Sequence, residues 1–239
     1  AMGVTPRSAT LYVNGGSATR TATHAAVNFD NAFKFGRDRT NSARNFVGQM
    51  DEICIYDRAL STAEIRNLMN LIRNNPNSGS LPSTDASLKA YYQFNEGATF
   101  PAYDRVGVNH AILAGAANKT TISTAPVGGG TFQSMAVTSG GLKDFAAPGV
   151  ELTFPAAGTF PNGDVVVSRL NVMADQMPSA LTLPFNPKAY YVIRNYGSNA
   201  SFTALSSIKM KNVEGTNSAM VASPSEQKLF KRGSNDEGV

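Results

Sequence analysis

The chain has no tryptophan, only two histidines and a single cysteine among its 239 residues. The single cysteine, Cys54, excludes an intrachain disulfide, and in its apolar surroundings we expect it to behave as a small hydrophobic residue. No apolar stretch approaches the roughly 20 residues that a membrane-spanning helix needs, so the sequence predicts no membrane insertion. The first residues lack the pattern of a secretory signal, and we expect any targeting signal to lie upstream in a longer protein.

Charged residues are also scarce, at 16% of the chain against about a quarter in typical domains. The formal net charge is +4, and the basic residues are scattered. Arg37, Arg39 and Arg44 form the only loose basic cluster, which Asp38 interrupts. A nucleic-acid-binding face would need a denser basic stripe with aromatic side chains. The sequence therefore predicts no nucleic-acid partner.

Most of the chain shows the alternation of apolar and polar residues that is typical of β-strands. The segment TLYVNGG (10–16) places Leu11 and Val13 on one face and ends in an Asn-Gly turn signal. The segment NFVGQMDEICIY (45–56) predicts another strand. Beyond residue 130, short runs rich in β-branched and aromatic residues have the spacing of a β-sandwich.

Helical periodicity occurs once, over residues 61–73. Ser61 is the predicted N-cap, and Glu64 three residues later completes a capping box. The apolar stripe consists of Ile65, Leu68, Met69 and Ile72. Pro76 should stop the helix near its preceding residue, and the segment at about 74–87 reads as an exposed linker. Because a parallel α/β sheet needs alternating helices, the sequence predicts an all-β fold with one short helix.

Three segments of the first 72 residues carry a family resemblance. LYVNGG, FKFGR and FVGQMDEICIYDRALSTAEIRNLM occur in this order. Together they resemble the C-terminal half of a laminin-G-like, concanavalin-A-like jelly roll, in which the third segment is the last strand and the short helix that closes the domain. The resemblance implies an antiparallel jelly-roll portion.

A later segment, LKAYYQFNEGATFPAYDRVGVNHAILAG (88–115), resembles the way in which such domains begin. The closing half therefore precedes the opening half. Either a first jelly roll ends near residue 75 and a second begins at 88, or residues 88–127 pair back onto the first domain. We favour the second arrangement, because the first and last strands of this fold lie side by side.

The remaining region has a weaker resemblance, carried by FPNGDVVVSRLN, YYVIRNYGSNASFTALSSIKM and KLFKRGS. It resembles β-rich segments downstream of laminin-G-like modules in secreted or cell-surface proteins of Bacteroidota. We therefore expect two domains, a jelly-roll portion at 1–127 and a second β-sandwich at 131–239. The second domain is expected to be incomplete at its C-terminus.

The resemblance also implies a metal site. In this family the Asp that opens the last strand often helps to hold a structural calcium ion, which makes Asp51 a metal ligand. Its partners would come from the opening segment: the carbonyl of Asn95, or Glu96, or Asp104. Hard oxygen ligands suit Ca²⁺, which would tie the last strand to an early loop. The alternative is that Asp51 only accepts backbone hydrogen bonds at the end of a strand.

Asp51 and Glu52 do not form a convincing catalytic pair. Adjacent strand residues point to opposite faces, so the two carboxylates cannot flank one glycosidic bond. The jelly-roll glucanases carry carboxylates at alternating strand positions, and the pattern Glu-any-Asp-any-any-Glu is absent. His24 and His110 have no matching nucleophile and acid, and the glycine-rich residues 126–131 fit no phosphate-binding motif. We therefore predict that the chain is not an enzyme.

Without tryptophan, any stacking of a sugar ring would fall to tyrosine or phenylalanine. The tyrosines considered are Tyr91, Tyr92, Tyr190, Tyr191 and Tyr196, each more often a core or sheet residue. We expect a non-catalytic module of a bacterial extracellular or cell-surface protein, acting in adhesion, carbohydrate binding or as a structural spacer. A glycan or surface polysaccharide and neighbouring domains would be its partners. The alternative is an accessory region of a secreted polysaccharide-degrading enzyme whose catalytic domain lies outside this chain.

Overall fold

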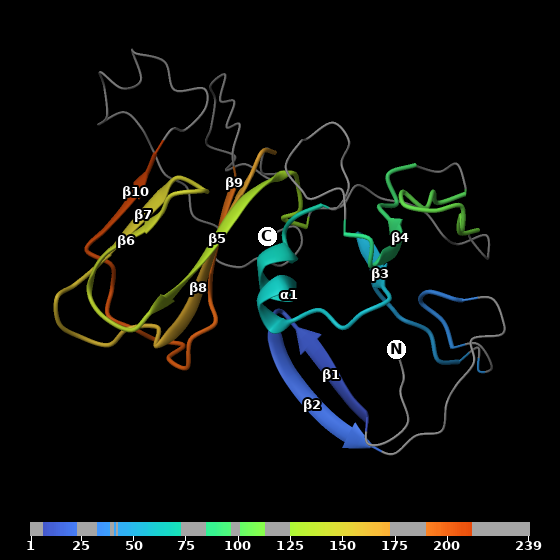
Figure 1. Ribbon diagram of the computed structural model, residues 1–239, viewed down its shortest axis with the longest axis horizontal. Helices are drawn as coiled ribbons and strands as arrows, with labels where there is room; N and C mark the ends of the chain where they lie inside the picture. The colour runs from blue at the N-terminus through green and yellow to red at the C-terminus, as the bar shows by residue number, and fades with distance from the viewer. Residues whose placement is uncertain are drawn as a thin grey trace, which may run out of the picture. The chain divides into compact units, whose positions relative to one another are not determined.

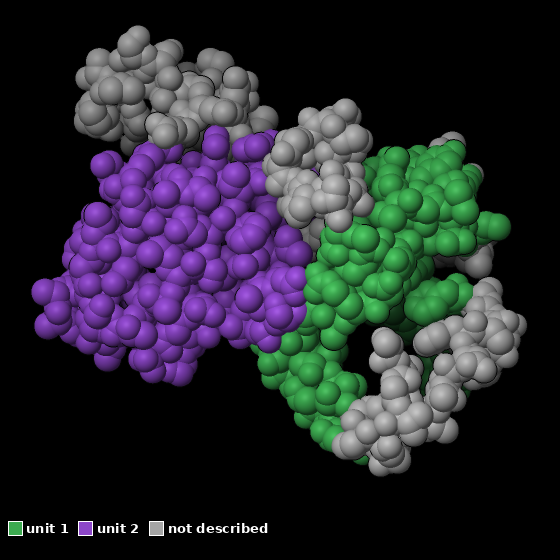
Figure 2. All heavy atoms as spheres, in the orientation of Figure 1, with its two compact units in different colours: residues 1–60, 84–121 green, residues 61–83, 122–239 purple. Residues whose placement is uncertain are grey.

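The computed structural model describes residues 7–22, 33–38, 41, 43–72, 85–96, 101–112, 125–172 and 190–211 (Figure 1). Over these residues the chain is strand-rich, with one short helix, and all pairs of named strands are antiparallel. This confirms the predicted all-β class. The chain divides into two compact units, residues 1–60 with 84–121 and residues 61–83 with 122–239 (Figure 2). We call them unit 1 and unit 2.

Unit 1 begins with a hairpin of β1 (Arg7–Val13) and β2 (Gly16–Ala22), in which Val13 pairs with Gly16. Asn14 and Gly15 form its two-residue turn, and both have positive φ angles, of 50° and 78°. Two successive positive φ angles are the requirement of a type I′ turn, which explains the Asn-Gly preference. The predicted hairpin turn is therefore confirmed.

The second strand pair of unit 1 joins β3 (Ile53–Tyr56) to β4 (Leu88–Tyr92). Beside it, Arg58 forms an ion pair with Asp85 at 2.9 Å. The opening-like segment thus pairs with the closing strand, as in the arrangement that we favoured. Beyond β4, Asp104 makes an isolated bridge with Tyr92, and Ala102 makes one with Ala111. Tyr92, Ala102 and Ala90 form a small buried cluster that Phe35 and Phe94 adjoin.

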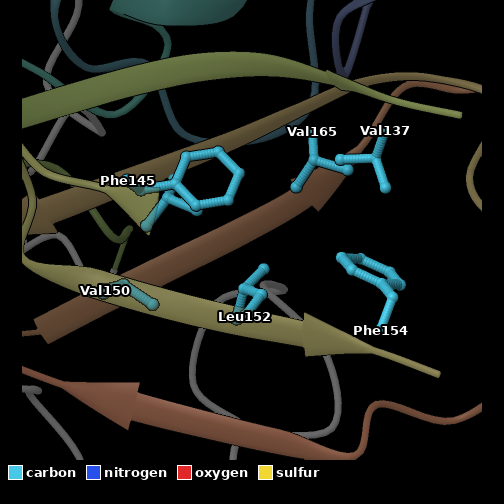
Figure 3. Packing of buried hydrophobic residues seen from close by; sticks show 7 residues of the cluster. Val137, Phe145, Val150, Leu152, Phe154 and Val165 are labelled. Atoms are coloured by element: carbon cyan, nitrogen blue, oxygen red, sulfur yellow. The ribbon is translucent and has the colours of Figure 1, made fainter. Parts of the chain in front are cut away.

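Unit 2 contains two three-stranded sheets, with strand orders β10–β7–β6 and β5–β8–β9. The strands are β5 (Gly130–Val137), β6 (Gly141–Phe145), β7 (Val150–Phe154), β8 (Gly163–Leu170), β9 (Tyr190–Asn195) and β10 (Ser207–Met210). The residues of the main core cluster are Val137, Phe145, Val150, Leu152, Phe154, Val165 and Val167, six of which Figure 3 labels. Their side chains gather between the strands, so burial of apolar surface holds this unit together.

The helix α1 (Thr62–Leu68) begins as the sequence predicts. The Ser61 hydroxyl accepts the backbone N–H of Glu64 at 3.2 Å, and the Glu64 carboxylate accepts the N–H of Ser61 at 2.7 Å. The helix ends earlier than the predicted residue 73. Leu71 instead forms a parallel bridge with Gly128, whose N–H donates to the Asn70 carbonyl at 3.1 Å. This tertiary pairing overrides the helical continuation, while the predicted stop near residues 74–75 lies outside the described residues.

The helix belongs to unit 2, whereas the sequence placed it in a first domain at 1–127. Leu71 is buried in a cluster with Leu170 and Val192. The Arg66 guanidinium lies 3.8 Å from the Asp164 carboxylate and 4.5 Å from the centre of the Tyr196 ring. These contacts place the segment after Ser61 with the β5–β8–β9 sheet, and they explain why the grouping differs from the expected boundary.

Candidate functional site

Asp51 and Glu52 lie just before β3 and outside its regular pairing. Glu52 has a φ angle of 52°, in the left-handed region. The Asp51 carboxylate accepts the backbone N–H of Glu52 at 2.9 Å. The prediction that both residues continue the strand with alternating faces is therefore wrong. A left-handed residue breaks the extended geometry on which that alternation depends.

The Glu52 carboxylate is directed to a tyrosine on the neighbouring strand. Its Oε2 atom accepts the hydroxyl of Tyr91, whose ring is completely buried. The same hydroxyl accepts a hydrogen bond from the Gln93 amide at 2.9 Å. Glu52 thus links the segment just before β3 to β4 through a side-chain hydrogen bond.

Asp104 is the most buried of the predicted calcium ligands, with 5% of its surface exposed. Its Oδ1 atom accepts the backbone N–H groups of Tyr91 at 3.1 Å and Val106 at 3.0 Å. Its Oδ2 atom has no hydrogen-bond partner of normal geometry within the described residues. A Cβ atom on Gly107 would lie only 2.8 Å from this oxygen, so the close approach requires glycine.

Two opposing effects set the ionisation of Asp104. Burial raises the pKa of its carboxyl group, because it disfavours the charged form. Surrounding backbone amides lower the pKa by a larger total amount, and the result lies below the ordinary value. These amides belong to Val106, Tyr91, Gly107 and Asn109. Asp104 therefore carries a negative charge that fixes its loop against β4.

Glu96 and Asn95 follow β4 in a turn. The Glu96 Oε1 atom accepts the backbone N–H of Tyr103 and the guanidinium of Arg105, both at 3.1 Å. Asn95 is exposed. Glu96 is therefore already balanced by a cation from its own chain.

The four predicted ligands do not converge on one cation in this conformation. Tyr92 pairs with Ile53 on one side and with Asp104 on the other, so β4 separates the segment of Asp51 from that of Asp104. Two strand spacings amount to roughly 10 Å, whereas calcium–oxygen distances are about 2.3–2.6 Å. No group of three or more His, Cys, Asp or Glu side chains suited to a metal occurs in the part of the chain that the structure describes. Of the four predicted ligands, only Asp104 has a buried side-chain oxygen without a hydrogen-bond partner among the described residues, and calcium binding stays a prediction.

The tyrosines proposed from the sequence are poor candidates for an open sugar-binding platform. Tyr91 and Tyr92 are buried. Tyr190 and Tyr191 pack beside the core clusters of unit 2, and the Tyr196 ring contacts the Arg66 guanidinium. Their alternating apolar sequence could not distinguish an exposed ring from a covered one.

Sequence reasoning missed Tyr103, whose side chain remains accessible. Tyr103 is 45% exposed, and its ring forms a T-shaped pair with the His110 ring, with 5.1 Å between centres. Ala102 and Asp104 on either side of it are both buried, and an extended chain turns alternate residues to opposite sides, so the Tyr103 side chain faces away from the buried cluster. Arg105 lies beside it, held by Glu96.

Comparison with known proteins finds a family similarity for part of the chain. Residues 2–66 match the laminin G type of the concanavalin A-like lectin/glucanases superfamily. The match confirms the resemblance of the first segment, and it covers β1 to β3 and the start of α1. No curated protein and no solved structure matches the chain. Within the described residues, no helix is long and apolar enough to span a bilayer.

Proposed function

We propose that this chain is a non-catalytic module of a bacterial extracellular or cell-surface protein that binds carbohydrate or mediates adhesion. The observation that carries the proposal is the match of residues 2–66 to a superfamily of lectins and glucanases. Domains of the laminin G type are often extracellular, which supports the location. Neighbouring domains of a longer protein and a surface glycan are the partners that this role requires.

The two carboxylates just before β3 support a binding role over catalysis. A glycosidase needs two carboxyl groups facing one bond, about 5–5.5 Å or about 6.5–9.5 Å apart. The Asp51 carboxylate accepts the neighbouring amide, and Glu52 accepts the hydroxyl of the buried Tyr91. Both groups thus serve local structure.

The test is a panel of neutral and acidic polysaccharides, with binding and the release of reducing ends measured on the same samples. The proposal predicts saturable binding to at least one polysaccharide without turnover. Turnover that one point mutation abolishes would overturn the non-catalytic role. Absence of binding to every member of a broad panel would overturn carbohydrate binding.

A second role fits the same match, because the superfamily also contains glucanases. In this role the chain is an accessory region of a secreted polysaccharide-degrading enzyme. The test compares the full-length parent protein with a form that lacks this region. Faster degradation of the bound polysaccharide when the region is present would distinguish this role from adhesion.

A further inference from the structure

The exposed ring of Tyr103 is held in a fixed position. The loop that carries Tyr103 is closed at its base by two backbone hydrogen bonds between Ala102 and Ala111, both of 2.9 Å. The His110 ring packs against the tyrosine ring in a T-shaped pair, with the two planes at 79°. A ring that is already ordered loses little conformational entropy when a ligand stacks on it. Tyr103 therefore provides a preorganised aromatic surface.

The Arg105 guanidinium is held close to the backbone of Tyr103. Its Nη2 atom donates to the same Glu96 oxygen that accepts the backbone N–H of Tyr103, and an extended chain turns the side chains of residues 103 and 105 to the same side. The Glu96 side chain is only 10% exposed, whereas that of Arg105 is 38% exposed. The less exposed Glu96 carboxylate therefore holds the more exposed guanidinium in place. Within the described chain, the other N–H groups of Arg105 make no hydrogen bond.

His110 adds a further donor at this surface. Its Nδ1 atom accepts the backbone N–H of Asp104 at 3.1 Å. In the neutral imidazole the proton then lies on Nε2, which becomes a hydrogen-bond donor. His110 is exposed, so this donor is accessible to a ligand.

We propose that Tyr103, Arg105 and His110 form a binding site for a carboxylate-bearing sugar unit, such as a hexuronic acid. The tyrosine ring matches the apolar face of a pyranose. The guanidinium and imidazole donors match a carboxylate, which Arg binds with charge-assisted hydrogen bonds. Of the two nearby carboxylates, Glu96 already accepts two hydrogen bonds and Asp104 is buried, so the accessible donors of Arg105 and His110 outnumber the accessible acceptors of these residues. This donor excess favours an acidic sugar over a neutral one.

This site rests on the proposed carbohydrate-binding function and narrows it. The test uses the complete chain and two probes, polygalacturonate and its methyl-esterified form. We expect Tyr103→Ala and Arg105→Gln each to weaken polygalacturonate binding about tenfold or more. Tyr103→Phe, which keeps the ring, should bind within about threefold of the original chain, and Arg105→Lys should recover part of the affinity. Val108→Ala, a highly exposed residue of the same loop, is the matched control and should bind normally.

The outcomes separate this site from the broader function. Each variant should unfold thermally at the same midpoint as the original chain. An unchanged midpoint shows that a loss of affinity does not come from a loss of folded protein. Tight binding that survives both Tyr103→Ala and Arg105→Gln overturns this site and leaves the proposed function standing. Equal affinity for the esterified polymer overturns the acidic specificity. Loss of binding on chelation assigns recognition to calcium instead of these donors, and failure to bind any polysaccharide overturns the site together with the proposed function.

Discussion

In unit 2, two three-stranded sheets enclose one large apolar cluster, whereas in unit 1 the strands form two separate pairs around a small cluster. Unit 1 relies more on buried polar groups, since Asp104 and the Glu52–Tyr91 pair tie its loops to β4. Apolar burial stabilises without regard to direction, while hydrogen bonds fix orientation. The comparison indicates a sandwich held together by apolar burial in unit 2 and loops oriented by buried hydrogen bonds in unit 1.

The largest loss of stability is expected from a substitution in the core of unit 2. Phe145→Ala removes a fully buried ring and should lower the free energy of unfolding of this unit by about 3–5 kcal/mol. Leu142→Ala, on the same strand but at a side chain that is 57% exposed, should cost well under about 1 kcal/mol. Denaturant unfolding measures both. Equal costs for the two variants would contradict the sandwich core.

Unit 1 should respond most to loss of a buried polar group. Asp104→Ala leaves the amides of Tyr91 and Val106 without their acceptor and should lower the free energy of unfolding by about 2 kcal/mol. Asp57→Ala is the control, because its ion pair with Lys89 is half exposed and contributes little. If Asp104→Ala were no more costly than Asp57→Ala, the loop would not depend on this carboxylate.

Asp104 should also make the stability of the folded chain depend on pH. The pKa of Asp104 is lower in the folded chain than its ordinary value, so its stabilisation is fully present above the unfolded pKa of about 3.9. The stabilisation is lost as the pH falls through the lower folded value. Asp104→Asn should therefore reduce the acid dependence of the free energy of unfolding, measured at a series of pH values below about 5. An unchanged slope would show that Asp104 ionisation is not linked to folding.

The predicted calcium site should give a smaller effect. Calcium at ten times its dissociation constant would raise the free energy of unfolding by about 1.4 kcal/mol, and a chelator would reverse the gain. Asp51→Ala should remove this dependence, whereas Glu52→Ala should keep it, because Glu52 is directed to Tyr91. Thermal unfolding with calcium and with a chelator gives the measurement. A melting curve that chelation leaves unchanged supports the alternative in which Asp51 only accepts the backbone amide.

The helix cap gives the smallest expected change. Ser61→Ala removes the acceptor of the Glu64 N–H and should cost about 1 kcal/mol in unit 2, measured by denaturant unfolding. Ser201→Ala, at an exposed position outside the named elements, is the control. A negligible difference between the two would mean that the capping box does not support α1.

The features predicted from the sequence are those that neighbouring residues determine. The capping box of Ser61 and the Asn14-Gly15 turn depend on residues within four positions of each other. The early end of α1 depends instead on Gly128, which is distant in sequence. The left-handed geometry of Glu52 and the exposure of Tyr103 likewise depend on partners that periodicity does not specify. The family resemblance identified the relevant strands, but it could not identify which side chains remain accessible.

Hydrogen exchange of the complete chain, alone and with saturating polygalacturonate, tests the division between a recognition unit and a stabilising unit most directly. The account predicts slower exchange of amides in residues 101–112 and the adjoining β4, with unchanged exchange over residues 130–170. Slower exchange confined to the sandwich strands of unit 2 would contradict it.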